Sequence, residues 1–291
     1  MRAESRADRL RTALGFPRPE ILTQDSYDAD EETIRRIRDG RPAVRDWDGY
    51  IEAAIYGKPF QPDLFGYVLP EILTRWEETI GENHFGELVP LALVRCLPVA
   101  IPLEQMLPVA EYLAESVLDR FERLEWLAPP DRAASNVVYQ WVEMLGTAAL
   151  VPGSIRHLMA AWSRLETVGP ATAMMQFASC VFYRTTENPL FPAWTPQLGG
   201  GPPCLWEEPG FAFGRGWHPS NTVGLADSLS PERLIELATL ASDLVHPVDR
   251  GLARHIVSEI PVRRSFIEDR WPLLLKMLEE PQSSLSELWD A

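Results

Sequence analysis

Apolar side chains recur at steps of three and four along most of the chain, which is the spacing of one face of an α-helix. Residues 103–127 show this pattern most strongly, and the charged residues of the segment fall on its other faces. Pro129 and Pro130 follow, and proline ends a helix because it has no backbone N–H to donate. The segment therefore predicts one helix with a buried face. The residues of that face are Met106, Ala110, Leu113, Val117, Phe121 and Leu124.

Further helices are predicted from the same spacing and from the residues that begin and end them. Ser230 and Pro231 are typical of a helix start, and Asp249 can cap the next helix. Residues 171–184 are apolar on nearly every face, which predicts a central, buried helix. Pro70 should kink or break its helix. The remaining predicted helices cover residues 28–40, 46–57, 62–81, 131–150, 154–168, 230–245 and 250–260 and the region around 266–278.

The chain shows no convincing strand pattern, so the predicted fold is all-α, either an irregular multi-helix bundle or a short stack of helix pairs. Residues 65–76 and 85–96 share phenylalanine, glycine, proline, leucine and arginine at matching positions. Such a match also arises by chance in a chain of 291 residues, so a true repeat is not favoured, and both the irregular bundle and the short stack of helix pairs stay open. The length allows one or two domains. We expect a single domain over residues 1–291, in which residues 1–25 could form a flexible N-terminal portion.

One segment, residues 185–229, departs from the helical pattern and predicts a long internal loop rich in glycine, proline and tryptophan. Its centre, residues 199–221, reads GGGPPCLWEEPGFAFGRGWHPSN. The glycines match neither the GxGxxG nor the GxxxxGK[ST] phosphate-binding pattern. Long loops in compact chains are often functional, although this one could equally be a structural cover over the core. Its candidate binding residues are Trp206, Glu207, Glu208, Arg215, Trp217 and His218.

The net charge of −15, from 42 acidic and 27 basic side chains, argues against binding to nucleic acid or to an anionic membrane surface. The apolar run at residues 88–103 contains Arg95 and three prolines and is shorter than the ~20 residues that span a bilayer, so we expect it to form core. The N-terminus lacks the apolar stretch of a secretory signal. The three cysteines show no CxxC spacing, which fits a reducing compartment. The expected location is cytoplasmic.

None of the sequence patterns that specify a chemistry occurs in the chain. The zinc-protease HExxH, the nucleophile elbow GxSxG and the DDxxD metal motif are missing, and no cofactor or metal is expected. His255 and Glu259 lie four residues apart on a predicted helix, where such residues usually form a surface or half-buried hydrogen-bonded pair. Cys180 lies in an apolar helix and should behave as a small buried hydrophobe. The sequence leaves catalysis open and favours a role without it.

The acidic stretch at residues 25–32 predicts either solvated helix ends or a docking surface for a basic protein, since complementary charge speeds association. The function that we expect is therefore that of a soluble acidic protein that binds another protein. In its concrete form this is an inhibitor or immunity-type neutraliser of a basic effector protein. Two alternatives stay open: a helical hydrolase with its site under the 185–229 loop, and a helical scaffold that binds a peptide in a groove. The candidate docking residues are Asp28, Asp30, Glu31 and Glu32.

Overall fold

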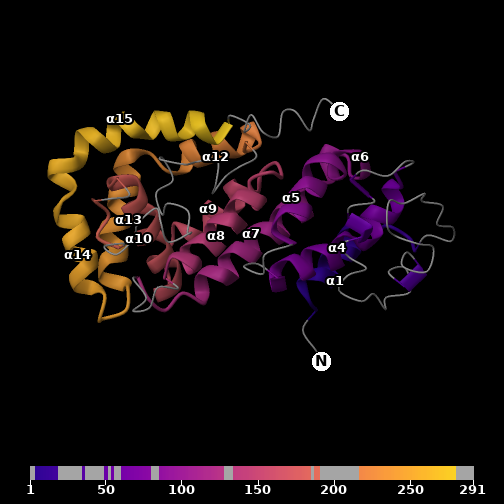
Figure 1. Ribbon diagram of the computed structural model, residues 1–291, viewed down its shortest axis with the longest axis horizontal. Helices are drawn as coiled ribbons and strands as arrows, with labels where there is room; N and C mark the ends of the chain where they lie inside the picture. The colour runs from indigo at the N-terminus through magenta and orange to yellow at the C-terminus, as the bar shows by residue number, and fades with distance from the viewer. Residues whose placement is uncertain are drawn as a thin grey trace. The chain divides into compact units, whose positions relative to one another are not determined.

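A computed structural model describes residues 4–18, 35–36, 49–51, 54–55, 60–79, 85–127, 134–184, 187–190 and 216–279. All of the regular structure in these ranges is helical, which confirms the all-α fold (Figure 1). The chain divides into two compact units, Met1–Tyr112 and Leu113–Ala291. The single domain expected from the sequence stays a prediction.

The first unit is built around α4 (Pro62–Thr79), a long helix with several helical neighbours. α4 continues through Pro70, so the predicted break does not occur. Burial of the apolar face of α4 against its neighbours outweighs the unfavourable proline, because tertiary packing overrides local preference. The helices that pack on α4 are α1 (Arg6–Leu14), α5 (Phe85–Arg95) and α6 (Leu97–Ala100). The unit also contains η1 (Leu103–Gln105) and the start of α7 (Leu107–Glu122).

α1 lies within the N-terminal portion, residues 1–25. The Ser5 hydroxyl accepts a hydrogen bond from the Asp8 N–H at 3.1 Å and caps the start of the helix. Gly15 ends the helix in the left-handed conformation, with φ of 66°, which glycine adopts without strain. Arg6 forms an ion pair with Glu77 of α4 at 2.6 Å. This ion pair attaches α1 to α4.

The apolar run at residues 88–103 forms most of α5, α6 and the start of η1, and most of its side chains are buried, as the sequence predicts. Its thiol, Cys96, donates a hydrogen bond to the carbonyl of Ala54 at 3.3 Å. Burial raises the pKa of this thiol to about 12, so it stays protonated. Among the described residues, no helix combines the length and the apolar character that a membrane crossing requires.

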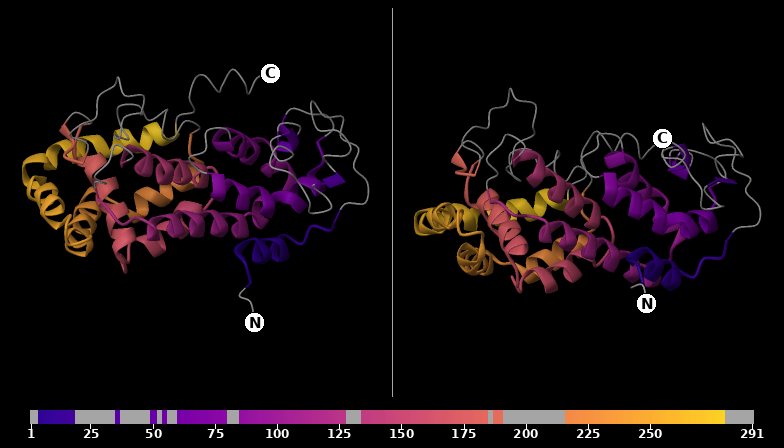
Figure 2. Two further views of the ribbon diagram at one scale, coloured as in Figure 1. Left: turned by 60° about the horizontal axis from the view of Figure 1, so that its bottom comes forward. Right: turned by 90° about the horizontal axis from the view of Figure 1, so that it is seen from below.

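The second unit is organised around α10 (Val168–Phe182), in which every side chain from Gly169 to Phe182 is buried. This confirms the central buried helix, with Cys180 only 2% exposed. α10 packs against α13 and α15, and α14 and α15 follow one another along an edge of the unit (Figures 1 and 2). After α7, the described helices of this unit besides α10 are α8 (Ala134–Ala148), α9 (Ser154–Trp162), α12 (Pro219–Ser228), α13 (Pro231–Leu244), α14 (Arg250–Ser258) and α15 (Ile260–Glu279).

Four aromatic rings at the centre of the second unit join α7 to the next three helices. The ring centroid of Phe121 lies 4.6 Å from that of Trp162 and 5.6 Å from that of Trp141. Phe177 of α10 lies 5.8 Å from Trp162. Aromatic contacts of this kind contribute about 0.5–1.5 kcal/mol each beyond their burial. The cluster therefore fixes the end of α7 against α10.

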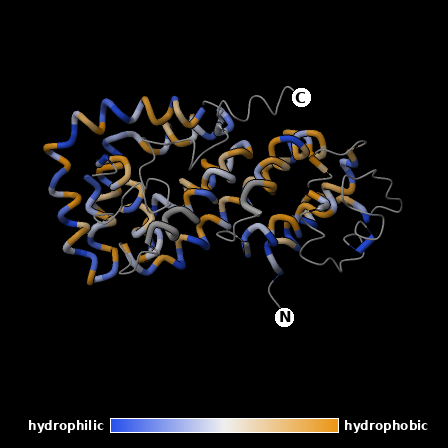
Figure 3. The backbone as a smooth tube through the Cα atoms, in the orientation of Figure 1, coloured by the Kyte–Doolittle hydropathy of each residue, from blue (hydrophilic) through white to orange (hydrophobic). Residues whose placement is uncertain are grey.

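α15 corresponds to the helix predicted around residues 266–278, and it begins six residues earlier, at Ile260. Its hydropathy alternates along its length (Figure 3). The buried residues from position 267 onward follow steps of four, three and four, which place them on one helical face. They are Ile267, Trp271, Leu274 and Leu278.

The segment 185–229 is not a loop throughout. Residues 219–228 form α12, so the loop prediction is wrong for this part, while residues 191–215 lie outside the described residues. Pro219 occupies the first position of α12, where the missing N–H has no cost. The Nδ1 atom of His218 caps the helix by accepting a hydrogen bond from the Ser220 N–H at 3.2 Å.

The side chain of Asn221 stabilises α12 in its position. Its side-chain amide donates hydrogen bonds to the carbonyls of Ala149 and Val151, both at 2.7 Å. Its Oδ1 accepts from the Ile155 N–H at 3.2 Å. The side chain is fully buried, so these bonds replace the ones that it would make with water. They hold α12 against the turn between α8 and α9.

Candidate binding site

The chain between α7 and α8 turns at residues 123–127, where the sequence predicted a continuing helix. Asp249 holds this turn from its buried side, since its Oδ2 accepts a hydrogen bond from the Leu127 N–H at 2.9 Å. The carboxylate makes no capping bond to α14, so the predicted cap is wrong. The physical reason is that the buried N–H of Leu127 would otherwise lack an acceptor, which costs about 1–3 kcal/mol.

Gln176 of α10 binds the same turn. Its Nε2 donates to the carbonyl of Leu127 at 3.1 Å and lies 3.4 Å from that of Trp126, while its Oε1 accepts from the Trp141 Nε1 at 2.9 Å. Gln176 is fully buried, and this network uses both ends of its amide. Together with Asp249, Gln176 fixes the backbone of the turn that carries the Trp126 side chain.

α7 ends at Glu122 because the first turn of α10 lies directly against it. A Cβ atom at Gly169 would overlap the carbonyl oxygen of Phe121 and lie 2.8 Å from the Cα of Glu122, so only glycine allows this approach. The Thr167 hydroxyl donates to the carboxylate of Glu122, 2.9 Å and 2.8 Å from its two oxygens. The junction thus positions one carboxylate at the start of α10.

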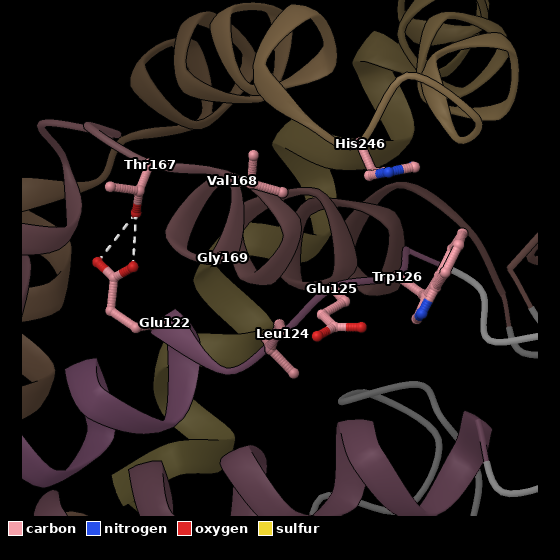
Figure 4. Close-up of a pocket in the computed structure, with 8 residues that line it drawn as sticks. All are labelled: Glu122, Leu124, Glu125, Trp126, Thr167, Val168, Gly169 and His246. Carbon is pink, nitrogen blue, oxygen red and sulfur yellow. Dashed lines mark hydrogen bonds between the residues drawn. The ribbon is translucent and has the colours of Figure 1, made fainter.

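A pocket of about 410 Å³ opens at this junction, within the second unit (Figure 4). In the view of Figure 4, Glu122 and Thr167 lie at one end, Trp126 and His246 lie at the other, and Glu125 lies between them. The ring centroids of Trp126 and His246 are 4.9 Å apart. The residues that line the pocket are Glu122, Leu124, Glu125, Trp126, Thr167, Val168, Gly169 and His246.

The charges around this pocket favour a cation. Two carboxylates, Glu122 and Glu125, line it, and none of the described lining residues is a lysine or an arginine. α7 ends at the pocket and α13 ends two residues before His246, and the C-terminal end of a helix carries partial negative charge. The start of α10 contributes partial positive charge, but the carboxylate of Glu122 lies beside it and offsets it.

Trp126 differs from the other tryptophans that the structure describes. Its side chain is 37% exposed, whereas the other five are buried in the cores of the two units. An exposed indole beside carboxylates is available for contact with a planar or cationic group. The five buried tryptophans are Trp76, Trp141, Trp162, Trp217 and Trp271.

Two of the loop residues predicted as binding candidates are described, and neither lines the pocket. Trp217 is buried and its backbone N–H donates to the Leu278 carbonyl. The backbone N–H of His218 donates to the Ala149 carbonyl at 3.0 Å, and burial lowers the pKa of its side chain. These contacts support a structural role for this part of the segment. The predicted residues that lie outside the described residues are Trp206, Glu207, Glu208, Arg215, Asp28, Asp30, Glu31 and Glu32.

In the part of the chain that the structure describes, no group of three or more histidine, cysteine, aspartate or glutamate side chains is placed to hold a metal ion. His255 lies exposed near the end of α14, and Glu259 follows that helix as its C-terminal cap residue. The pocket can therefore supply carboxylates, an indole and an imidazole to a ligand, which makes it the candidate binding site.

Comparison with known proteins provides no relative from which a role could be transferred: no protein-family model matches the chain, and no curated protein or solved structure matches it. None of the polar or aromatic residues that line the pocket was a candidate binding residue in the sequence, and Glu125 and Trp126 show why. The apolar spacing of α7 continues to Leu124, which hides the end of the helix. The only local signal is that an acidic and an aromatic residue stand shortly before Pro129 and Pro130.

Proposed function

We propose that this protein is a soluble, cytoplasmic protein that binds a basic protein partner through an acidic surface. In the concrete form of the proposal, binding neutralises the partner, as an inhibitor or an immunity-type protein does. The net charge of −15 supports the proposal, because a protein with a strong negative field attracts a basic partner before contact and speeds association.

The observation that carries the proposal is the combination of an exposed Trp126 with Glu122 and Glu125 in one pocket. Tryptophan is among the residues that contribute most to binding energy in protein interfaces. Asp249 and Gln176 form hydrogen bonds with the backbone of Leu127, and they thereby restrain the backbone of its neighbour Trp126. A side chain that stands on a fixed backbone loses less conformational freedom on binding than one on a mobile loop. The pocket therefore has the properties of an anchor point for a partner.

The acidic residues Asp28, Asp30, Glu31 and Glu32 are proposed as a second docking surface, in the first unit. We expect them to act through their charge, so their reversal should slow association and make it less sensitive to salt. The two surfaces can be tested separately because they belong to different units.

The experiment is affinity capture from the lysate of the native host, with wild type and the double variant Glu122→Lys, Glu125→Lys as paired baits. We expect wild type to retain one basic protein in a stoichiometric amount at low salt and to release it as salt rises. The double variant should retain much less. Retention of no protein, of an acidic protein, or of a basic protein in equal amount by both baits contradicts the assignment of the pocket as the anchor point.

A further inference from the structure

We infer that the pocket of the second unit is a site for the guanidinium group of an arginine side chain, which stacks on Trp126 and pairs with Glu125. The inference rests on the proposed binding of a basic partner and names the group that the partner would insert. Four features of the pocket lead to it: a carboxylate without a hydrogen-bond partner among the described residues, a second carboxylate that already has one, a planar aromatic face, and a described lining without lysine or arginine.

Glu125 is the available carboxylate. It lines the pocket, it is exposed, and within the described part of the chain it makes no hydrogen bond or ion pair. Glu122, in contrast, already has a hydrogen-bond partner, because the Thr167 hydroxyl donates to its oxygens. Glu122 also lies beside the start of α10, whose partial positive charge it offsets. An incoming cation therefore finds Glu125 without a partner and Glu122 in a fixed position.

The aromatic side of the pocket selects a planar cation. Trp126 and His246 lie with their ring centroids 4.9 Å apart and their planes tilted by 52°, so the imidazole covers part of the indole, and Glu125 lines the same pocket (Figure 4). A guanidinium can stack on an indole and at the same time donate two parallel hydrogen bonds to a carboxylate. A lysine ammonium is a compact, strongly hydrated charge that cannot do both.

Competing groups are few. The described lining of the pocket contains no lysine or arginine. Arg123, which lies between Glu122 and Leu124 in the chain, is exposed and is not part of that lining. A metal ion is a poorer fit, because the described residues form no cluster of three ligands. An anion is a poorer fit still, because it would meet two carboxylates.

The test uses three short peptides that differ at one position: Gly-Arg-Gly, Gly-Lys-Gly and Gly-citrulline-Gly, each with blocked ends. Citrulline has the shape of arginine and no charge. Binding is followed by NMR through the indole N–H resonance of Trp126, which is assigned by its loss in the Trp126→Phe variant. We expect the arginine peptide to shift this resonance with millimolar affinity, the lysine peptide to bind about fivefold more weakly, and the citrulline peptide to have no effect.

Two matched variants test the carboxylate. Glu125→Gln removes the proposed partner of the guanidinium, and we expect it to weaken binding of the arginine peptide about fivefold. Glu111→Gln removes an equal charge from an exposed position of α7 outside the pocket lining, and we expect it to leave the affinity unchanged. An unmoved Trp126 resonance, an equal effect of lysine or citrulline, or equal weakening by the two variants overturns the inference.

Different experimental results would contradict the arginine site and the proposed partner binding. If wild type and Glu125→Gln retain the same basic protein equally, and the arginine peptide leaves Trp126 unmoved, then partner binding stands and the arginine site is wrong. If the arginine peptide binds at Trp126 and capture retains no basic protein, then the arginine site stands and the partner proposal is wrong.

Discussion

The turn at residues 123–127 has two sides that use polar groups in opposite ways. On its buried side, Asp249 and Gln176 bind the backbone of Leu127, and Trp141 completes the network. On its pocket side, Glu125 makes no hydrogen bond or ion pair with any described residue, and Trp126 is partly exposed. Polar groups of the first kind are matched inside the protein, whereas Glu125 on the second side has no partner among the described residues.

This difference separates stability from binding along a stretch of five residues. Removing a buried partner leaves a polar group without a hydrogen bond and destabilises the fold. Removing an exposed side chain that has no partner changes the free energy of unfolding little. The comparison is therefore open to direct test, because each side predicts a different response to substitution.

The largest effect is expected at Gly169, which lines the pocket and lies against the end of α7. Gly169→Ala places a Cβ against the carbonyl group of Phe121, and backbone atoms cannot move aside as a flexible side chain can. We expect a loss of about 3 kcal/mol in the free energy of unfolding, measured by urea denaturation.

The matched control for this substitution is Gly251→Ala. Gly251 is also the second residue of its helix, α14, and a Cβ there meets no atom within 4 Å. We expect it to be neutral or to stabilise by up to about 1 kcal/mol, because alanine favours a helix over glycine. Equal effects of the two substitutions would show that the close approach of α10 to α7 is not a constraint on the fold.

The second-largest effect on the free energy of unfolding is expected on the buried side of the turn. Asp249→Ala removes the acceptor of the Leu127 N–H, and we expect a loss of about 2 kcal/mol in the free energy of unfolding. Asp249→Asn keeps an oxygen acceptor at the same position and should lose less. Urea denaturation measures both. Asp249→Ala should also weaken binding of the arginine peptide, although Asp249 does not line the pocket. Identical stabilities of the Ala and Asn variants would remove the hydrogen bond as the cause.

Much of the helical framework was predictable because its signals are local. The start of α13 is encoded by Ser230 and Pro231, and the Ser230 hydroxyl accepts from the Arg233 N–H at 3.2 Å. The apolar residues of α10 predict burial on every side, as found. In both cases the physical cause lies within a few residues in the sequence.

α12 and the pocket were not predictable because their causes lie far away in the chain. α12 was interpreted as loop, and the contact that holds it joins Asn221 to Ala149, 72 positions away. The turn at Leu127 depends on Asp249, which is 122 positions away. A pattern of apolar residues cannot show that a buried carboxylate will bind a backbone N–H instead of capping its own helix.

A smaller, pH-dependent effect is expected at His218, a predicted binding residue whose contacts are structural. Its Nδ1 accepts from the Ser220 N–H, which requires the neutral ring, and burial lowers its pKa below the ordinary value of 6.5. The unfolded state therefore takes up the proton first as the pH falls. The stability that His218 contributes is present above about pH 6.5 and is lost as the pH falls through its lower folded-state pKa.

His218→Asn provides the comparison for this prediction, because asparagine is a good helix cap and does not titrate. Between pH 7 and pH 5 we expect the free energy of unfolding of wild type to fall by up to about 1 kcal/mol relative to the variant. Urea denaturation at several pH values measures the difference, in which the titration of other groups cancels. Parallel curves for the two proteins would show that protonation of His218 does not break the cap.

The smallest effect on stability is expected on the pocket side, and it is the one that sharpens the comparison most. Glu125→Gln removes a charge that makes no hydrogen bond or ion pair within the described residues, so we expect the free energy of unfolding to change by less than about 0.5 kcal/mol. Glu111→Gln on the exposed face of α7 should behave alike. The two variants should then differ only in binding the arginine peptide. A loss of more than about 1 kcal/mol for Glu125→Gln alone would mean that this carboxylate serves the fold, and the division between the two sides of the turn would no longer hold.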